Sequence, residues 1–132
     1  MSNDKKECHE AALKAYKQYS GHDYVSKSTP YDPPSIKDLA FLGFDRSYGE
    51  SWSRPGLDSR TKSFVCMTIT ATLGLEDHLK NHIAFAHNIG ITKDEVVELL
   101  IHLNGYIGTP RTNTALKVAR GVWKNMGEKR KA

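Results

Sequence analysis

The chain has 132 residues, of which 39% are hydrophobic and 26% charged, and a formal net charge of +4. This length suits one domain or one subunit of an assembly, and the composition excludes a disordered chain. The modest positive charge favours a small anionic partner rather than nucleic acid, because no aromatic-basic interleaving or known reading module is visible.

The sequence shows no segment for a membrane or for secretion. Its longest apolar run, Phe64 to Leu73, is interrupted by threonines. The first residues lack the apolar stretch of a signal peptide, so we expect a cytoplasmic protein. Cys8 and Cys66 form no C-x-x-C pair, and we expect both to be free thiols in a reducing compartment.

The first half of the chain predicts two helices with a long connection between them. Residues 4–19 have apolar positions at helical spacing, with Gly21 as a stop. Residues 21–34 hold three prolines and read as a connection. Ser35, with Asp38 three residues later, predicts the start of the second helix, which is expected to end in the region of residues 48–51.

A loop with a Pro-Gly pair follows at residues 52–57, and Asp58 is then a good N-cap for a helix that reaches Leu73. Residues 64–70 are β-branched enough to form a strand by propensity alone. We favour a helix because the distance from Asp58 to Gly74 is long for a strand. This helix is expected to be central and buried on most sides.

The last two helices have clear start signals. Thr92 and Glu95 form a T-x-x-E capping box, and Thr109 followed by Pro110 is an N-cap with proline at N1. The last helix is expected to stop near Gly127. The predicted architecture is all-α, with about six helices and short connections in the second half.

The segment 74–90 carries the strongest indication of chemistry. As a helix ended by Gly90, it places His78 and His82 one turn apart on a single face, with Glu76 close to its start. Three groups that can move protons, on an element with an otherwise apolar face, indicate a lined pocket.

Each of these residues also has a purely structural interpretation. His82 alone would more often be a packing histidine bonded to a backbone carbonyl, His78 a half-exposed polar residue, and Glu76 a carboxylate favoured by the helix dipole. A histidine pair at i, i+4 can also bind a divalent metal. No third ligand is fixed here and the glutamate of H-E-x-x-H is lacking, so we expect no metal.

The order and spacing of several segments closely resemble those of carboxymuconolactone decarboxylases, over roughly residues 45–125. The segments that carry the resemblance are Trp52–Ser63, Ala71–Gly74, Leu79–His82, Asn88–Glu95 and Tyr106–Pro110. Their agreement as independent local signals makes the resemblance specific. It implies a single domain over residues 1–132, with the N-terminal helix and connection at 1–34 preceding the core.

The resemblance implies an alkylhydroperoxidase D-like helical subunit that assembles into a homo-oligomer, a trimer or hexamer, with active sites near subunit contacts. It also implies removal of carbon dioxide from 4-carboxymuconolactone in aromatic-acid breakdown, without metal or organic cofactor. Thiol peroxidases of the wider superfamily carry a C-x-x-C pair. Leu75 and His78 occupy those positions here, which argues against such chemistry because it needs a thiolate pair.

The chain departs from the family pattern at positions that bear on the substrate. His78 stands where these decarboxylases usually carry glutamate, Ala84 where they carry arginine, Ile107 where cysteine is common, and Arg111 where a small residue is common. Two interpretations stay open. A carboxylate clamp has moved from position 84 to position 111, or a different acid, or no acid, is bound.

With the family position added, we expect His82 to stabilise the dienolate left by carbon dioxide and to deliver a proton, assisted by His78 or Glu76. Arg54 and Arg111 are candidate carboxylate binders or intersubunit ion-pair formers. Trp52 is a candidate pocket wall or an anchor at a subunit contact. The alternatives are another proton transfer, such as isomerisation or lactone opening on a small unsaturated acid, and a non-catalytic oligomeric binding subunit.

Overall fold

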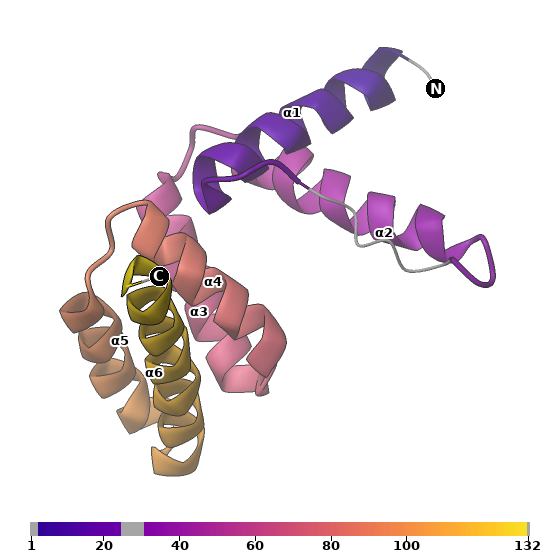
Figure 1. Ribbon diagram of the computed structural model, residues 1–132. Helices are drawn as coiled ribbons and strands as arrows, with labels where there is room; N and C mark the ends of the chain where they lie inside the picture. Colours follow the sequence, from indigo (N-terminus) through magenta and orange to yellow (C-terminus); the bar gives the residue numbers. More distant parts are fainter. Residues whose placement is uncertain (1–2, 25–30, 132) are drawn as a thin grey trace. The chain divides into compact units, whose positions relative to one another are not determined.

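The computed structural model describes residues 3–24 and 31–131, and all the secondary structure in these residues is helical (Figure 1). The elements are α1 (Asn3–Ser20), α2 (Ile36–Phe44), the π-helix η1 (Asp45–Trp52), α3 (Ser59–Leu73), α4 (Glu76–Asn88), α5 (Lys93–Ile107) and α6 (Thr109–Lys131). The all-α prediction is therefore confirmed. None of the described helices is both long and apolar enough to cross a bilayer.

The chain forms two compact units, residues 1–58 and residues 59–132. Part of the predicted connection at residues 21–34 lies outside the described residues.

In the first unit α1 packs along η1 through an aromatic cluster. Phe44, Tyr48 and Trp52 follow one another at four-residue spacing along one side of the chain. Trp52 stacks on Tyr19 of α1 with ring centroids 3.9 Å apart, and Phe44 stacks on Tyr24 at 4.1 Å. The Trp52–Tyr19 pair holds η1 against α1, and the Phe44–Tyr24 pair holds the end of α2 against the segment that follows α1.

The second predicted helix begins where the sequence indicates, but its capping and its end differ from expectation. The Ser35 side chain makes no capping hydrogen bond, so the S-x-x-D prediction is wrong in its chemistry although α2 begins at Ile36. After Phe44 the helix continues as the π-helix η1 rather than ending as an α-helix. Cys8 donates from its thiol to the Asp45 carbonyl (3.6 Å) and His9 pairs with the Asp45 carboxylate (2.7 Å), which ties α1 to this transition.

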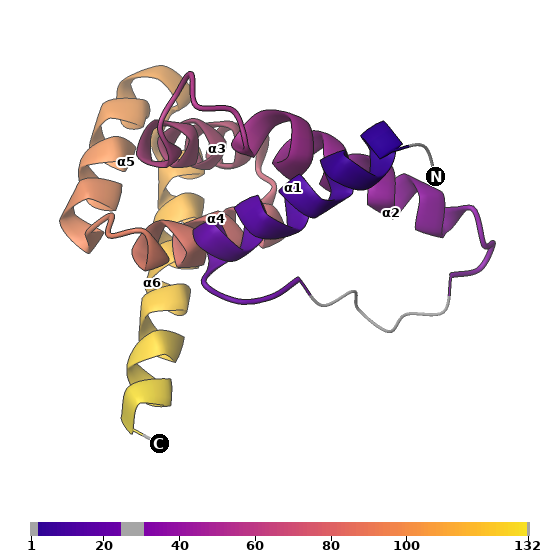
Figure 2. The ribbon, with the colours of Figure 1, turned by 90° about the horizontal axis from the view of Figure 1, so that it is seen from above.

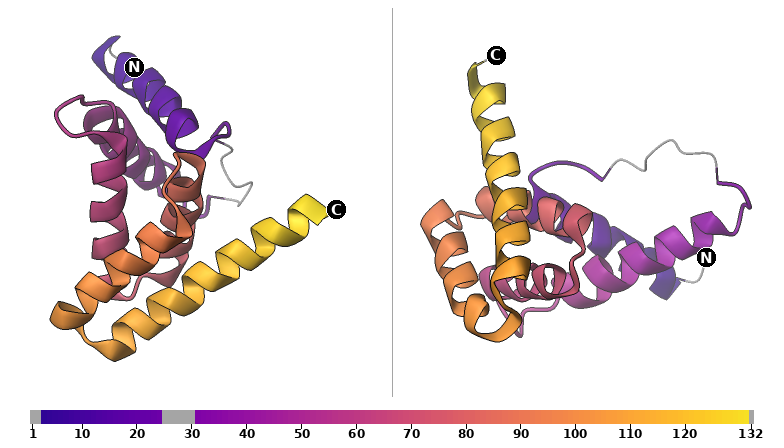
Figure 3. Two further views of the ribbon diagram at one scale, coloured as in Figure 1. Left: turned by 90° about the vertical axis from the view of Figure 1, so that its left-hand side faces the viewer. Right: turned by 90° about the horizontal axis from the view of Figure 1, so that it is seen from below.

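The second unit is a bundle of α3 to α6, in which α6 lies between α5 on one side and α3 and α4 on the other (Figure 1). The C-terminal part of α6 extends beyond the neighbouring helices (Figures 2 and 3). Side chains from all four helices and the α4–α5 turn form the core: Met67, Ala71, Leu79, Ile83, Ala86, Ile91, Val96, Leu100, Leu103, Ala115, Ala119 and Val122.

The predicted helix ends of this bundle are largely confirmed. Gly90 adopts φ 90° after α4, and the N–H groups of Gly90 and Ile91 donate to the carbonyls of His87 and Ala86 (3.1 and 3.0 Å), which is a Schellman motif. The Thr92 hydroxyl accepts from the Glu95 N–H at 3.1 Å, so Thr92 caps α5.

Three details of the bundle correct the sequence interpretation. The Glu95 carboxylate pairs with Arg60 of α3 instead of returning to the cap, so the predicted box is half formed. Helix α6 continues to Lys131 instead of stopping near Gly127. In the chain by itself α3 is not buried on most sides, because Val65, Ile69 and Leu73 are 47%, 49% and 61% exposed.

Candidate functional site

Helix α4 holds the two histidines as the sequence predicts, one turn apart. Its buried side chains Leu79, Ile83 and Ala86 face the core and fix the rotation of the helix. His82 is half-buried beside them and its ring meets the Phe85 ring edge-on, with centroids 6.2 Å apart. His78, one turn earlier, is exposed. The pair therefore has one sheltered and one solvated imidazole.

The surroundings of His82 favour its neutral form. Burial lowers the pKa of His82, and the nearby His78 lowers it further, to about 4. At pH 7 only about one molecule in a thousand then carries an imidazolium at this position. A neutral ring has one N–H donor and one nitrogen acceptor, so His82 can donate a hydrogen bond and accept a proton.

Arg111 reaches the turn that precedes the histidine helix. It lies in the first turn of α6, and its guanidinium occupies the space in which a side chain on Gly74 would begin. Gly74 has φ 70° and joins α3 to α4. Leu75 alone separates Gly74 from Glu76, the first residue of α4. The fold thus brings Arg111 and the histidine helix together within one unit.

Glu76 lies in the first turn of α4 beside Asp77, and both are exposed. Acidic residues here stabilise the positive end of the helix dipole. Because Arg111 lies at the same turn, the start of α4 carries charges of both signs.

Trp52 and Arg54 belong to the first unit. Trp52 is half-buried and stacks on Tyr19, so its side chain contributes to the aromatic cluster. Arg54 is exposed in the turn after η1, where its backbone N–H donates to the Ser51 carbonyl at 3.0 Å. Within the second unit, the structure brings Arg111 to the turn before α4.

A hollow between α4 and α6 was not predicted. It has a volume of about 490 Å³ and is lined by Lys80, Asn81 and Ala84 on α4 and by Val122, Asn125, Met126 and Glu128 on α6. Positions 80 and 84 lie about 200° around the helix from position 82, so this hollow adjoins another face of α4. The helical spacing of these residues is the signal that could have indicated it.

The described residues contain no cluster of three or more side chains suited to hold a metal ion. Cys8 and Cys66 are free thiols. Burial raises the pKa of the Cys66 thiol, so it stays protonated and is a poor nucleophile.

The comparison with known proteins agrees with this architecture. The model of the carboxymuconolactone decarboxylase family matches residues 40–121, more than half of the chain. The chain belongs to this family.

Two curated proteins are similar to this chain. A 4-carboxymuconolactone decarboxylase of Acinetobacter baylyi is 43% identical over 81 residues, which are 61% of this chain and 60% of that protein. Nitrosuccinic acid decarboxylase of Metarhizium robertsii is 27% identical over 117 residues, which are 89% of this chain and 82% of that protein. The chain therefore matches less than two thirds of the length of the first relative. The family assignment confirms the resemblance drawn from the sequence segments.

Proposed function

We propose that this protein is a decarboxylase that removes carbon dioxide from a small anionic organic acid, with His82 as its central catalytic residue. The observation that carries the proposal is the sheltered, neutral imidazole of His82 on a helix whose start is reached by Arg111. The names of both relatives, which specify decarboxylation, support the reaction type.

The chemistry requires a group that stabilises negative charge on the substrate. When the bond between the carboxylate carbon and the skeleton breaks, the electron pair moves into the conjugated system and forms a dienolate. The His82 N–H would donate a hydrogen bond to the dienolate oxygen, and a proton supplied by water would then be added to carbon.

Arg111 would hold the substrate carboxylate that is not lost. A guanidinium binds a carboxylate through two parallel hydrogen bonds and stays charged at all working pH values. Its place at Gly74, against the start of α4, supports the interpretation that the cation has moved from position 84 to position 111. Arg54 and Trp52 remain candidate substrate-binding residues.

His78 and Glu76 would act as assisting groups. His78 lowers the pKa of His82 and, being solvated, can exchange protons with water. Glu76 lies two positions before His78 in the first turn of α4 and stays a candidate assisting group. We assign neither residue a step of its own.

The substrate that we favour is a lactone of the 4-carboxymuconolactone type, converted without a cofactor in aromatic-acid breakdown. The 43% identical relative supports it. Nitrosuccinic acid is the second candidate, because the relative named for it matches a larger share of this chain. An isomerase or lactone-opening enzyme, or a binding subunit without catalysis, are the alternatives that this assignment has to exclude.

To test the proposal, purified protein is incubated with 4-carboxymuconolactone or with nitrosuccinic acid. The released carbon dioxide and the spectrum of the remaining substrate are measured. Release from fresh 4-carboxymuconolactone supports the first assignment, and release from nitrosuccinic acid alone supports the second. Proton exchange or ring opening without release would show an isomerase or a lactone-opening enzyme. No reaction and no thermal shift with either acid would show that the proposal is wrong, because a bound ligand stabilises the folded state.

A further inference from the structure

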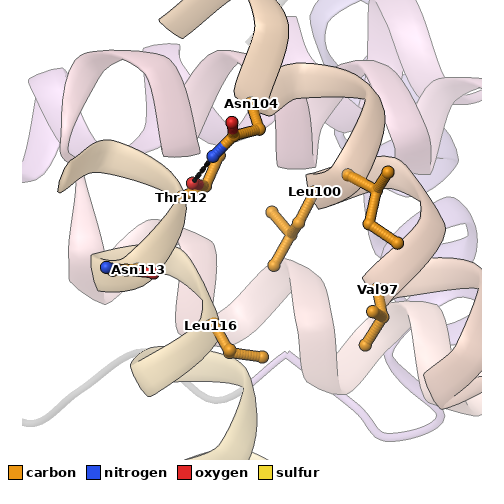
Figure 4. Close-up of a pocket in the computed structure, with 7 residues that line it drawn as sticks. Val97, Leu100, Asn104, Thr112, Asn113 and Leu116 are labelled. Atoms are coloured by element: carbon orange, nitrogen blue, oxygen red, sulfur yellow. Dashed lines mark hydrogen bonds between the residues drawn. The ribbon is translucent and has the colours of Figure 1, made fainter. Parts of the chain in front are cut away.

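A second hollow lies between α5 and α6, and α4 contributes no residue to it (Figure 4). Its volume is about 340 Å³, within the roughly 300–1,000 Å³ typical of small-molecule sites. Val97, Leu100 and Ile101 of α5 form one wall and Leu116 of α6 the facing wall. The walls would contact an apolar ring or a short chain.

One end of this hollow is polar and fixed by hydrogen bonds. The Asn104 amide donates to the Thr112 hydroxyl at 2.8 Å, drawn in Figure 4, and to the Thr109 hydroxyl at 3.3 Å. Thr112 is buried and its hydroxyl donates in turn to the backbone carbonyls of Gly108 and Thr109. This network holds α5 and α6 at a set distance, so the apolar walls exist before any ligand arrives.

The hollow continues into a cationic one along α6. The adjoining hollow, of about 350 Å³, shares Asn113 and Leu116 with the first and adds Lys117 and Arg120. None of the residues that line either hollow is acidic. Within the described part of the chain, Lys117 and Arg120 form no ion pair. The two cations are therefore available to an anion.

We propose that the α5–α6 groove, formed by these two hollows, binds a small carboxylate that carries an apolar ring. The ring would lie between Leu100 and Leu116, and the carboxylate would face Lys117 and Arg120. Apolar walls beside two cations select this class of ligand. A neutral ring would form no ion pair with Lys117 or Arg120, and a carboxylate without a ring would make no apolar contact with the walls. This is a second site, separate from the proposed catalytic one on α4.

The first experiment titrates the full chain with benzoate at low salt and follows backbone amide signals by NMR. Acetate and benzyl alcohol serve as probes that keep only the charge or only the ring. Benzoate is expected to shift signals of residues 97–104 and 112–120 and to bind at least about tenfold more tightly than either probe. Shifts confined to α4, or equal binding of all three probes, would overturn the proposal.

The second experiment removes the two cations together, as Lys117→Gln with Arg120→Gln. Benzoate affinity is expected to fall about tenfold. The matched control is Lys6→Gln with Lys14→Gln, which removes the same charge from exposed positions of α1 and should leave the affinity unchanged. Equal loss in both variants would mean attraction by net charge only, and the groove would not be a site.

The third experiment tests the apolar wall with Ile101→Asn, which replaces a side chain that is 61% exposed and is expected to fold normally. Benzoate affinity should fall while sedimentation of the protein stays the same. A changed sedimentation coefficient with unchanged benzoate binding would instead show that another copy of the chain covers the groove.

The variant His82→Asn tests whether the two sites are separate. Wild-type benzoate affinity in this variant would confirm that they are, and a loss of benzoate affinity would contradict it.

Discussion

The protonation of His82 determines what this residue contributes to both stability and chemistry. Its pKa of about 4 in the folded chain lies below its ordinary value of 6.5, because burial and His78 disfavour the imidazolium. The unfolded chain, in which the pKa is ordinary, therefore binds a proton more readily than the folded chain between pH 6.5 and pH 4.

This difference predicts that the contribution of neutral His82 to the free energy of unfolding is fully present above pH 6.5 and is lost as the pH falls to about 4. The loss would amount to at most about 3.5 kcal/mol, since one pKa unit corresponds to about 1.4 kcal/mol. Urea unfolding at a series of pH values would measure it in wild type and in His82→Gln. A wild-type curve as steep as that of the variant over this range would contradict a sheltered imidazole.

The close approach of the Arg111 guanidinium to Gly74 can also be tested. Gly74→Ala introduces a Cβ at φ 70° and into the space that the Arg111 guanidinium occupies, so both a strained backbone and a displaced arginine follow. Gly90→Ala is the matched control, because φ is 90° there but no atom lies within 4 Å of the added Cβ.

We expect Gly90→Ala to destabilise the chain by about 1 kcal/mol, and Gly74→Ala by more than that. Thermal unfolding measures both. The double variant Gly74→Ala with Arg111→Ala should recover the part due to the arginine. Equal effects at the two glycines would show that Arg111 is not held at this turn.

The sequence could predict part of this local arrangement. The four-residue spacing places His78 and His82 on one face, and two neighbouring imidazoles are sufficient to predict a lowered pKa for one of them. The spacing could not show which of them is sheltered, since that depends on the packing of Leu79 and Ile83. Nor could it place Arg111 at Gly74, because the contact joins two elements that are 37 positions apart.

At the scale of single elements, the two predicted N-caps have different outcomes and provide a paired test. Thr92 accepts a hydrogen bond from Glu95, whereas the Ser35 side chain makes no cap bond. Thr92→Ala should therefore destabilise the chain by about 1 kcal/mol, and Ser35→Ala should have almost no effect. Urea unfolding compares them, and a larger loss in Ser35→Ala would contradict the structure.

Most helices were predictable from local signals because caps and glycines act over one turn. The Gly90 stop and the Thr92 cap need only their neighbours. The π-helix η1 was not predictable in this way, because the hydrogen-bond shift after Phe44 accompanies packing of Tyr48 and Trp52 against α1. The continuation of α6 past Gly127 is a similar case, since glycine weakens a helix by about 1 kcal/mol without necessarily ending it.

At the scale of the whole molecule, the exposure of apolar residues on α3 bears on assembly. Their hydrophobicity predicted burial, yet Val65, Ile69 and Leu73 form an exposed stripe at four-residue spacing in the described chain. Hydropathy alone cannot distinguish a core face from a subunit contact, because both remove apolar area from water. We therefore keep the homo-oligomer, a trimer or hexamer, as a proposal in which another copy covers this stripe.

Ile69→Asp should weaken such an assembly, because a charge would then have to be buried at the contact. Thr114→Asp adds the same charge at an exposed position of α6 and is the control. Sedimentation velocity should show a smaller particle for Ile69→Asp only. A wild-type protein that sediments as one chain, or an unchanged Ile69→Asp particle, would contradict the proposed assembly.

The most direct test of the proposed catalytic role measures carbon dioxide release by His82→Asn on the acid that the wild type converts, with His102→Asn as the control. His102 is exposed on α5, outside the proposed site. We predict that His82→Asn lowers kcat at least about a hundredfold while folding normally, and that His102→Asn keeps the wild-type rate. Wild-type release by folded His82→Asn would show that this imidazole does not perform the chemistry.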